Sequence, residues 1–171
     1  SRHRSLKRGW VLDLKKLTPG EITTAVSGVL LLIFSFFKWY SVDFNFGAGF
    51  SGSVSRNGWQ SPGAIWSILA VLIGVVLAAH VIVEKLANVD MPERLGSLGW
   101  GIVHLAGGVL AFVFIIIKLI NESSSLAFGF YVGILASAGL AAGGYLMAKE
   151  SGELPQQLGG KGGGSTPPPA A

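Results

Sequence analysis

The chain has 171 residues, of which half are hydrophobic, 13% are charged and none is cysteine. A soluble domain usually carries about a quarter charged residues, and the charges here gather near residues 2–21, 84–94 and 149–161 with long apolar stretches between them, so the composition indicates a membrane protein. The missing cysteines exclude disulfides, thiolate metal sites and thiol catalysis.

Residues 1–17 form a basic segment in which apolar and basic side chains interleave. We expect a short amphipathic helix on the inner leaflet, where Lys7, Arg8, Lys15 and Lys16 contact anionic lipid. Its favoured role is an anchor that sets topology, and a lipid sensor or docking site is the alternative. The net charge of +4 therefore indicates a membrane partner and not nucleic acid, because six of the thirteen basic residues lie in this segment.

Four apolar stretches follow, each long enough to cross a hydrocarbon core of about 30 Å. The predicted spans cover about residues 21–40, 62–85, 97–120 and 125–148. The first begins at a capping box, in which Thr18 and Glu21 accept from each other's backbone amides. Short connections make consecutive helices antiparallel. The sequence thus predicts an all-α membrane protein, an antiparallel four-helix transmembrane bundle.

The basic residues also predict the orientation of the spans. With the N-terminus in the cytoplasm, ten basic residues lie inside, and only Lys38, Arg56 and Lys118 lie outside. Both termini are therefore expected in the cytoplasm. The aromatic residues agree, because they would form an outer belt of Trp39, Tyr40, Trp59 and Trp66 and an inner belt of Trp10 and Trp100.

The first outer loop, residues 41–61, alternates apolar and polar residues around several glycines. This pattern is typical of a small β-hairpin, which we expect to lie over the outer mouth of the bundle. Its aromatic side chains need cover, either from the bundle, which we favour, or from a partner. The candidate partner-contact residues are Phe44, Phe46, Phe50 and Trp59.

Helix four carries a small residue at every fourth position, a spacing that lets two helix backbones approach closely. We favour packing within one chain over an oligomer contact. The candidate packing residues on helix four are Gly129, Gly133, Ser137 and Ala141, and the expected counterparts on helix three are Ser97, Gly101, Gly107 and Ala111.

Ionisable residues within a span are functional by default. His80 and His104 lie on consecutive helices at a similar depth, about 8–10 Å from the inner surface at 1.5 Å per residue. They could face each other, with Glu84 one turn beyond His80. Lys38, at the outer edge of helix one, is expected to reach the headgroups or to pair with Asp43.

Two facing histidines are compatible with a haem, a divalent metal or a proton relay through Glu84. A metal would lack further ligands within the spans, so no metal site is predicted, and His80 and His104 stay as candidate cofactor ligands. The simpler interpretation is that each histidine donates to a carbonyl or serine of a neighbouring helix. The sequence contains no nucleophile elbow, phosphate loop or paired carboxylates, so no enzyme is predicted and no cofactor is assigned.

The chain divides into the basic segment 1–17, a membrane domain 18–150 and a tail 151–171. Glycine, proline and alanine dominate the tail from Gly159 onward, and such a composition cannot bury enough apolar surface to fold. We therefore predict a disordered cytoplasmic tail.

Residues 33–153 resemble a family of small uncharacterised four-span membrane proteins of actinobacteria. The likeness rests on Phe34-Ser35-Phe36-Phe37-Lys38-Trp39-Tyr40, then Asn57-Gly58-Trp59, then Ser61-Pro62-Gly63-Ala64-Ile65-Trp66. The family pattern has proline at the position of Lys38 and alanine at that of Gly58. The resemblance implies a bacterial plasma membrane, and it implies no particular activity.

Three functional hypotheses follow. The leading one is a non-enzymatic plasma-membrane protein that acts as an accessory, scaffold or envelope-interaction component. The alternative is a small transporter or channel-like protein with an inner vestibule at His80, His104 and Glu84. The second alternative is a haem-binding electron-transfer subunit.

Overall fold

The computed structural model describes residues 14–154, except 61–62, 88 and 93. Over this range the chain forms a short 3-10 turn, η1 (Leu14–Lys16), and four α-helices. The amphipathic helix expected within residues 1–17 and the tail from residue 155 onward lie outside the described residues. The helices are α1 (Pro19–Ser35), α2 (Ala64–Leu86), α3 (Trp100–Asn121) and α4 (Phe128–Glu150).

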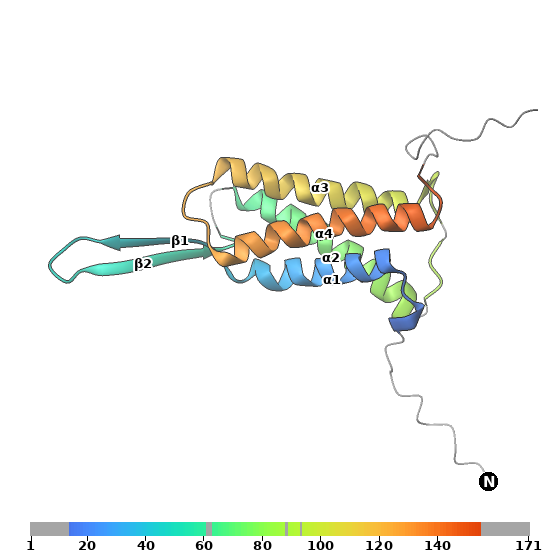
Figure 1. Ribbon diagram of the computed structural model, residues 1–171, viewed down its shortest axis with the longest axis horizontal. Helices are drawn as coiled ribbons and strands as arrows, with labels where there is room; N and C mark the ends of the chain where they lie inside the picture. Colours follow the sequence, from blue (N-terminus) through green and yellow to red (C-terminus); the bar gives the residue numbers. More distant parts are fainter. Residues whose placement is uncertain (1–13, 61–62, 88, 93, 155–171) are drawn as a thin grey trace, which may run out of the picture.

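The four helices lie side by side and run in alternating directions (Figure 1). Helix α1 packs against α2 and α4, α3 packs against the same two helices, and α2 and α4 lie across the diagonal. Helices α2, α3 and α4 are each long and apolar enough to cross a membrane. Helix α1 is apolar but has only 17 residues, which at 1.5 Å each span about 26 Å.

Helix α1 begins as predicted and ends earlier. The Glu21 amide donates to the Thr18 hydroxyl over 3.3 Å, and the Thr18 amide donates to the Glu21 carboxylate over 2.9 Å, so the capping box is confirmed. The expected end at Tyr40 is wrong, because the helix stops at Ser35 and the chain enters a strand at Lys38.

The predicted β-hairpin is confirmed. Strands β1 (Lys38–Asn45) and β2 (Ser51–Asn57) pair antiparallel, with a register shift between Lys38 and Tyr40. The segment before α4 extends the sheet at its base, where the Ser41 amide donates to the Ser125 carbonyl and the Ala127 amide donates to the Trp39 carbonyl. The hairpin is therefore fixed to the bundle by backbone hydrogen bonds at its base.

The expected position of the hairpin is wrong. It does not fold over the outer mouth of the bundle but projects away from it along the long axis of the molecule (Figure 1). The tip is consequently bare, with Phe46 80% and Phe50 76% exposed. The reason lies at the base, where the pairing with Ser125 and Ala127 directs β1 outward.

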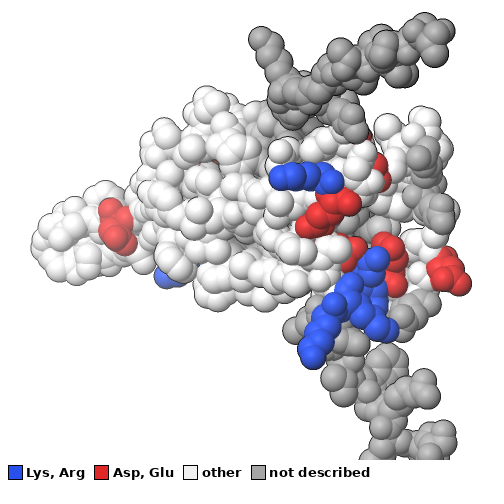
Figure 2. Space-filling view, turned by 45° about the vertical axis from the view of Figure 1, so that its right-hand side comes forward, with Lys and Arg blue, Asp and Glu red and all other residues white. Residues whose placement is uncertain are grey.

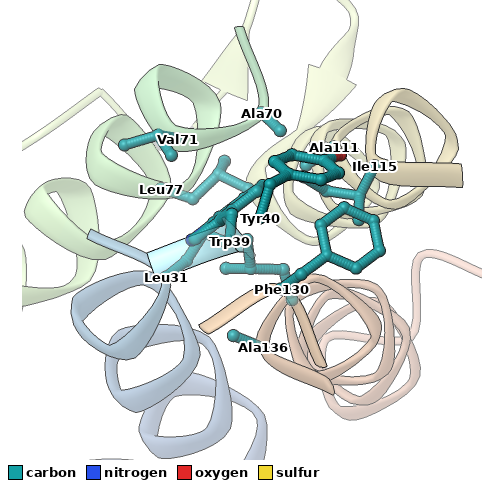
Figure 3. Close-up of a cluster of buried hydrophobic side chains, with 11 residues drawn as sticks. Leu31, Trp39, Tyr40, Ala70, Val71, Leu77, Ala111, Ile115, Phe130 and Ala136 are labelled. Atoms are coloured by element: carbon teal, nitrogen blue, oxygen red, sulfur yellow. The ribbon is translucent and has the colours of Figure 1, made fainter. Parts of the chain in front are cut away.

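The hydrophobic core reaches from the middle of the bundle to the base of the hairpin (Figure 3). Trp39 is fully buried and meets Phe130 edge-to-face at a centroid distance of 5.4 Å. Tyr40, also buried, lies 5.8 Å from the same ring. Trp39 and Tyr40 therefore do not belong to an outer aromatic belt, because they fill the space between α1, α3 and α4 and do not face lipid.

Small residues allow close helix approach, but with a different distribution from the one predicted. A Cβ at Gly129 or Gly133 would meet Trp39, not helix α3. The close contact between α3 and α4 is made instead at Gly108 and Gly144. A Cβ added at Gly108 would collide with the Leu140 backbone, and one added at Gly144 would collide with the His104 backbone. The predicted counterpart Gly107 faces Leu77 of α2.

Only some of the remaining predicted packing positions lie at a contact between helices. Gly101 does contact α4, at Ala148. Ser137 is buried, and its hydroxyl donates to the Ile134 carbonyl of its own helix, whereas Ala141 is only partly buried. Ser97 lies outside α3, between the two short strands β3 (Arg94–Leu95) and β4 (Leu98–Gly99). A strict four-residue repeat therefore does not describe the interface, because α4 touches α1, α3 and Trp39 on different sides.

Candidate functional site

Most of the described charged residues lie near the two ends of the helices. Figure 2 shows Lys, Arg, Asp and Glu gathered at the end opposite the hairpin, with few charges along the bundle or on the hairpin. The members at that end are Lys15, Lys16, Glu21, Glu84, Lys85, Asp90, Lys149, Glu150 and Glu153. We refer to it as the charged end.

The two candidate histidines meet near the charged end. The centroids of the His80 and His104 rings are 5.0 Å apart, and Trp100 stacks on His80 at 3.7 Å. Glu84 lies one turn beyond His80, with 3.8 Å between His80 Nε2 and the carboxylate. The sequence-based expectation that the histidines share a depth and that Glu84 shares their face agrees with these distances.

The two histidines differ in their hydrogen bonding. His104 is fully buried, with Nδ1 2.8 Å from the Trp100 carbonyl and Nε2 3.4 Å from the Leu77 carbonyl of α2. His80 is 8% exposed, and neither of its ring nitrogens has a hydrogen-bond partner within the described part of the chain. The simple structural role predicted for both histidines therefore fits His104 and does not account for His80.

A haem does not fit between these histidines. Two rings whose centroids are 5.0 Å apart are nearly in contact, whereas two axial ligands must stand on opposite faces of a porphyrin. In addition, Nδ1 of His104 is occupied by the Trp100 carbonyl, and its Nε2 faces Leu77. The geometry thus argues against His80 and His104 as a pair of cofactor ligands.

A polar network links His80 to helix α1. The Lys85 ammonium lies 3.4 Å from the Glu84 carboxylate and 3.3 Å from the Glu21 carboxylate. A cavity of about 240 Å³ opens beside this network. It is lined by Thr18, Glu21, Glu84, Trp100, Gly101, Met147, Glu150, Ser151 and Glu153.

Two of the carboxylates that line this cavity cap neighbouring helices. The Glu150 carboxylate accepts from the Gly20 amide at the start of α1, and the Glu153 carboxylate accepts from the Ile102 amide at the start of α3. A negative charge at a helix N-terminus is stabilising. Ser151–Leu154 therefore belong to the bundle and not to the tail, because Glu153 and Leu154 also donate to the Ala148 carbonyl.

The sequence reasoning missed a buried ion pair at the opposite end of the bundle. Lys118 is fully buried, its ammonium lies 3.6 Å from the Glu122 carboxylate, and it also sits 5.4 Å from the centre of the Tyr40 ring. Burial raises the pKa of the Tyr40 phenol, and the Glu122 carboxylate raises it further. The four-residue spacing of Lys118 and Glu122 was the available signal.

The hairpin has two chemically different faces. Cross-strand pairing places Val42 opposite Val54 and Phe44 opposite Gly52. Nearer the turn, the Phe46 amide donates to the Phe50 carbonyl. Because side chains alternate between the faces of a strand, these residues share one side, and we call it the apolar hairpin face: Val42, Phe44, Phe46, Phe50 and Val54. The opposite side is the polar hairpin face, made of Ser41, Asp43, Asn45, Ser51, Ser53 and Ser55.

The four predicted partner-contact residues therefore separate into two groups. Phe44, Phe46 and Phe50 lie on the apolar hairpin face. Trp59 lies beyond β2 at the hairpin base, where its indole donates to the Ser35 hydroxyl over 2.8 Å and its ring stacks on Phe36. Trp59 thus anchors the loop to α1.

Lys38, the remaining ionisable candidate, begins β1 and is exposed. No ion pair joins it to Asp43 within the described residues. Likewise, no group of three or more His, Asp or Glu side chains within residues 14–154, as far as they are described, has the arrangement of a metal site.

Comparisons with known proteins supply no assignment for this chain: no family model, no curated protein and no solved structure matches it.

Proposed function

We propose that this chain is a non-enzymatic integral membrane protein of a bacterial plasma membrane, and that it acts as an accessory or scaffold component. Its four helices cross the bilayer as a bundle, and both termini lie in the cytoplasm. The β1–β2 hairpin stands outside the membrane as a protein-interaction arm. The actinobacterial four-span family, which the chain resembles in residues 33–153, is the proposed family.

The observation that carries this proposal is the projecting hairpin with its bare apolar hairpin face. An exposed apolar patch of several hundred Å² with a polar surround is typical of a protein or membrane interaction site. The charge distribution supports the orientation, because basic residues favour the cytoplasmic side, and Lys15 and Lys16 lie at the charged end. Together with Lys7 and Arg8 they are the proposed contacts to anionic lipid.

A photo-crosslinking experiment in native membranes tests this function. A benzoylphenylalanine at Phe46, which is 80% exposed, should give a discrete protein adduct on irradiation. The same group at Val26, on the outer surface of α1, serves as the matched control and should give no discrete adduct. The absence of any adduct from Phe46 would contradict the docking role.

The cavity at the charged end favours a second candidate function, a small transporter. Its walls carry Glu21, Glu84 and Trp100, and His80 lies 3.8 Å from the Glu84 carboxylate and stacks on Trp100. The cavity spans only the inner part of the bundle, since a buried apolar cluster with Ile115 and Phe130 fills the part toward the hairpin. A transporter would therefore need a second conformation to open the outer half.

Flux in proteoliposomes tests this candidate. A transporter should move protons or small cations across the vesicle membrane, and His80→Ala should reduce that flux while Lys38→Ala, at the opposite end, leaves it unchanged. Vesicles that are no more permeable than protein-free ones would exclude the transporter hypothesis.

A further inference from the structure

The apolar hairpin face is incomplete as it stands in one chain. A two-stranded sheet is at best marginally stable in water unless another layer covers its apolar side. Here Val42 and Val54 lie at the centre of the face, and Phe44 and Phe46 pack on each other with ring centroids 5.4 Å apart. The Phe44 ring covers Gly52, where an added Cβ would strike it, but Phe46 and Phe50 are themselves 80% and 76% exposed.

The described part of the chain leaves this face largely uncovered. The hairpin points away from the bundle, and residues 14 and 154, the last described at each end, lie at the charged end (Figure 1). The hairpin also continues the bundle axis (Figure 1), so its apolar face stands away from the surface of its own membrane.

The chemistry of the face favours a second copy over a foreign protein. Recognition of a particular foreign partner depends on placed polar and charged groups. The polar groups of the hairpin lie on its other face, and on the apolar side only Arg56, opposite Tyr40 at the base, carries a charge. A purely apolar face can instead match an identical face across a two-fold axis, where each side chain meets its own counterpart or neighbour.

The available area is sufficient for such a contact. Phenylalanine and valine side chains with the exposures of these five residues offer roughly 500 Å² in each copy. Two copies would therefore bury at most about 1,000 Å², the least that a biological interface should clear. Confinement of both bundles to one membrane raises their effective concentration, so an interface of this size suffices.

Resting on the proposed function, we infer that the apolar hairpin face packs against the same face of a second copy and so joins two chains into a homodimer. The two hairpins would form a small four-stranded sandwich, with sheets about 10 Å apart and the side chains of the apolar hairpin face between them. The polar hairpin faces would remain outward, in water.

The absence of cysteine makes a direct test possible. Val54→Cys and Ser53→Cys place single thiols at neighbouring, exposed positions on opposite faces of β2. In oxidised native membranes, most of the Val54→Cys chain should run as a disulfide-linked dimer on a non-reducing gel, while Ser53→Cys stays monomeric. A monomeric Val54→Cys protein, or equal dimer formation by both variants, would overturn the inference.

A second measurement separates this inference from the docking function. Mass spectrometry identifies the adduct of the photo-crosslinker at Phe46. An adduct with the chain itself supports the homodimer, and an adduct with another protein refutes the homodimer while it leaves the docking function intact. No adduct at all refutes both.

Light scattering in detergent gives a further test. Phe46→Ser together with Phe50→Ser should convert a dimer to a monomer, and unchanged dimers would again refute the inference.

Discussion

Trp39 joins the hairpin to the bundle. It is fully buried, and its indole donates to the Phe34 carbonyl over 2.7 Å, while its carbonyl accepts from the Ala127 amide. Gly129 and Gly133 leave space for the ring, because a Cβ at either position would press on Trp39. One side chain thus connects the end of α1, the start of α4 and the first strand.

The buried Lys118–Glu122 pair leads to a prediction on stability. Loss of one member of a buried ion pair costs about 3 kcal/mol or more, whereas replacement of both members by apolar or neutral residues is often nearly neutral. Glu122→Gln should therefore lower the free energy of unfolding in detergent more than Lys118→Met with Glu122→Gln does. A double variant that is less stable than Glu122→Gln would show that Lys118 stabilises the fold through contacts other than this pair.

The Tyr40 phenol leads to a prediction on pH. Its pKa is raised in the folded protein by burial and by Glu122, so the folded state keeps a proton that the unfolded chain loses near pH 10. The stability contributed by the neutral phenol is thus complete below about pH 10 and is lost as the pH rises toward the folded pKa. Tyr40→Phe should reduce the fall in melting temperature between about pH 9 and about pH 11, a range centred on the ordinary pKa of tyrosine. Tyr131→Phe, at an exposed position of α4, is the control, and an equal effect in both variants would contradict the assignment.

At the scale of elements, helices α3 and α4 are held together by backbone-to-backbone contact. The small positions Gly108 and Gly144 lie against the backbone of the opposite helix. In helix pairs without a hydrophobic driving force, close packing and polar contacts supply the attraction. This explains why α4 is rich in glycine although glycine is a poor helix former.

The neighbours Gly107 and Gly108 provide a matched pair of variants. A Cβ at Gly108 would meet backbone atoms of Leu140 and Ala141, whereas a Cβ at Gly107 would meet the side-chain methyl groups of Leu77 at 3.1 and 3.3 Å. Gly108→Ala should destabilise the protein by about 1–3 kcal/mol through overpacking. Gly107→Ala should be close to neutral, because the gain in helix propensity, which both changes share, offsets the tight contact with the flexible Leu77 side chain. Equal thermal stability of the two variants in detergent would contradict this account of the interface.

At the scale of the whole molecule, the two ends differ in chemistry. One end carries most of the described charged residues and the helix caps made by Glu150 and Glu153, and the other carries the hairpin with its bare phenylalanines. Helices α2, α3 and α4 supply apolar lengths sufficient to cross a membrane between these ends. The asymmetry leads to a prediction of topology.

Single cysteines can measure that topology in a chain that has none. Ala48→Cys, in the hairpin turn, should react with a membrane-impermeant maleimide in intact cells. Lys149→Cys, at the charged end of α4, should react only after the cells are permeabilised. The reverse pattern would place the hairpin in the cytoplasm and would contradict the proposed orientation.

The sequence by itself determined the elements whose signals are local. Apolar runs of sufficient length, the Thr18–Glu21 capping box and the alternation after Tyr40 predicted the helices, the start of α1 and the hairpin. Histidine depth was also predictable, because it follows from helical rise along two consecutive helices. The meeting of His80 and His104, however, depended on how those helices are rotated.

Only the tertiary structure decided features that arise from contacts between distant segments. The pairing of β1 with Ser125 and Ala127 sets the direction of the hairpin, and Trp39, which follows the end of α1, packs against Gly133 of α4. The burial of Lys118 depends on Tyr40 and Glu122 lying beside it. Local periodicity carries no information about such partners, because residues far apart in the chain create these environments together.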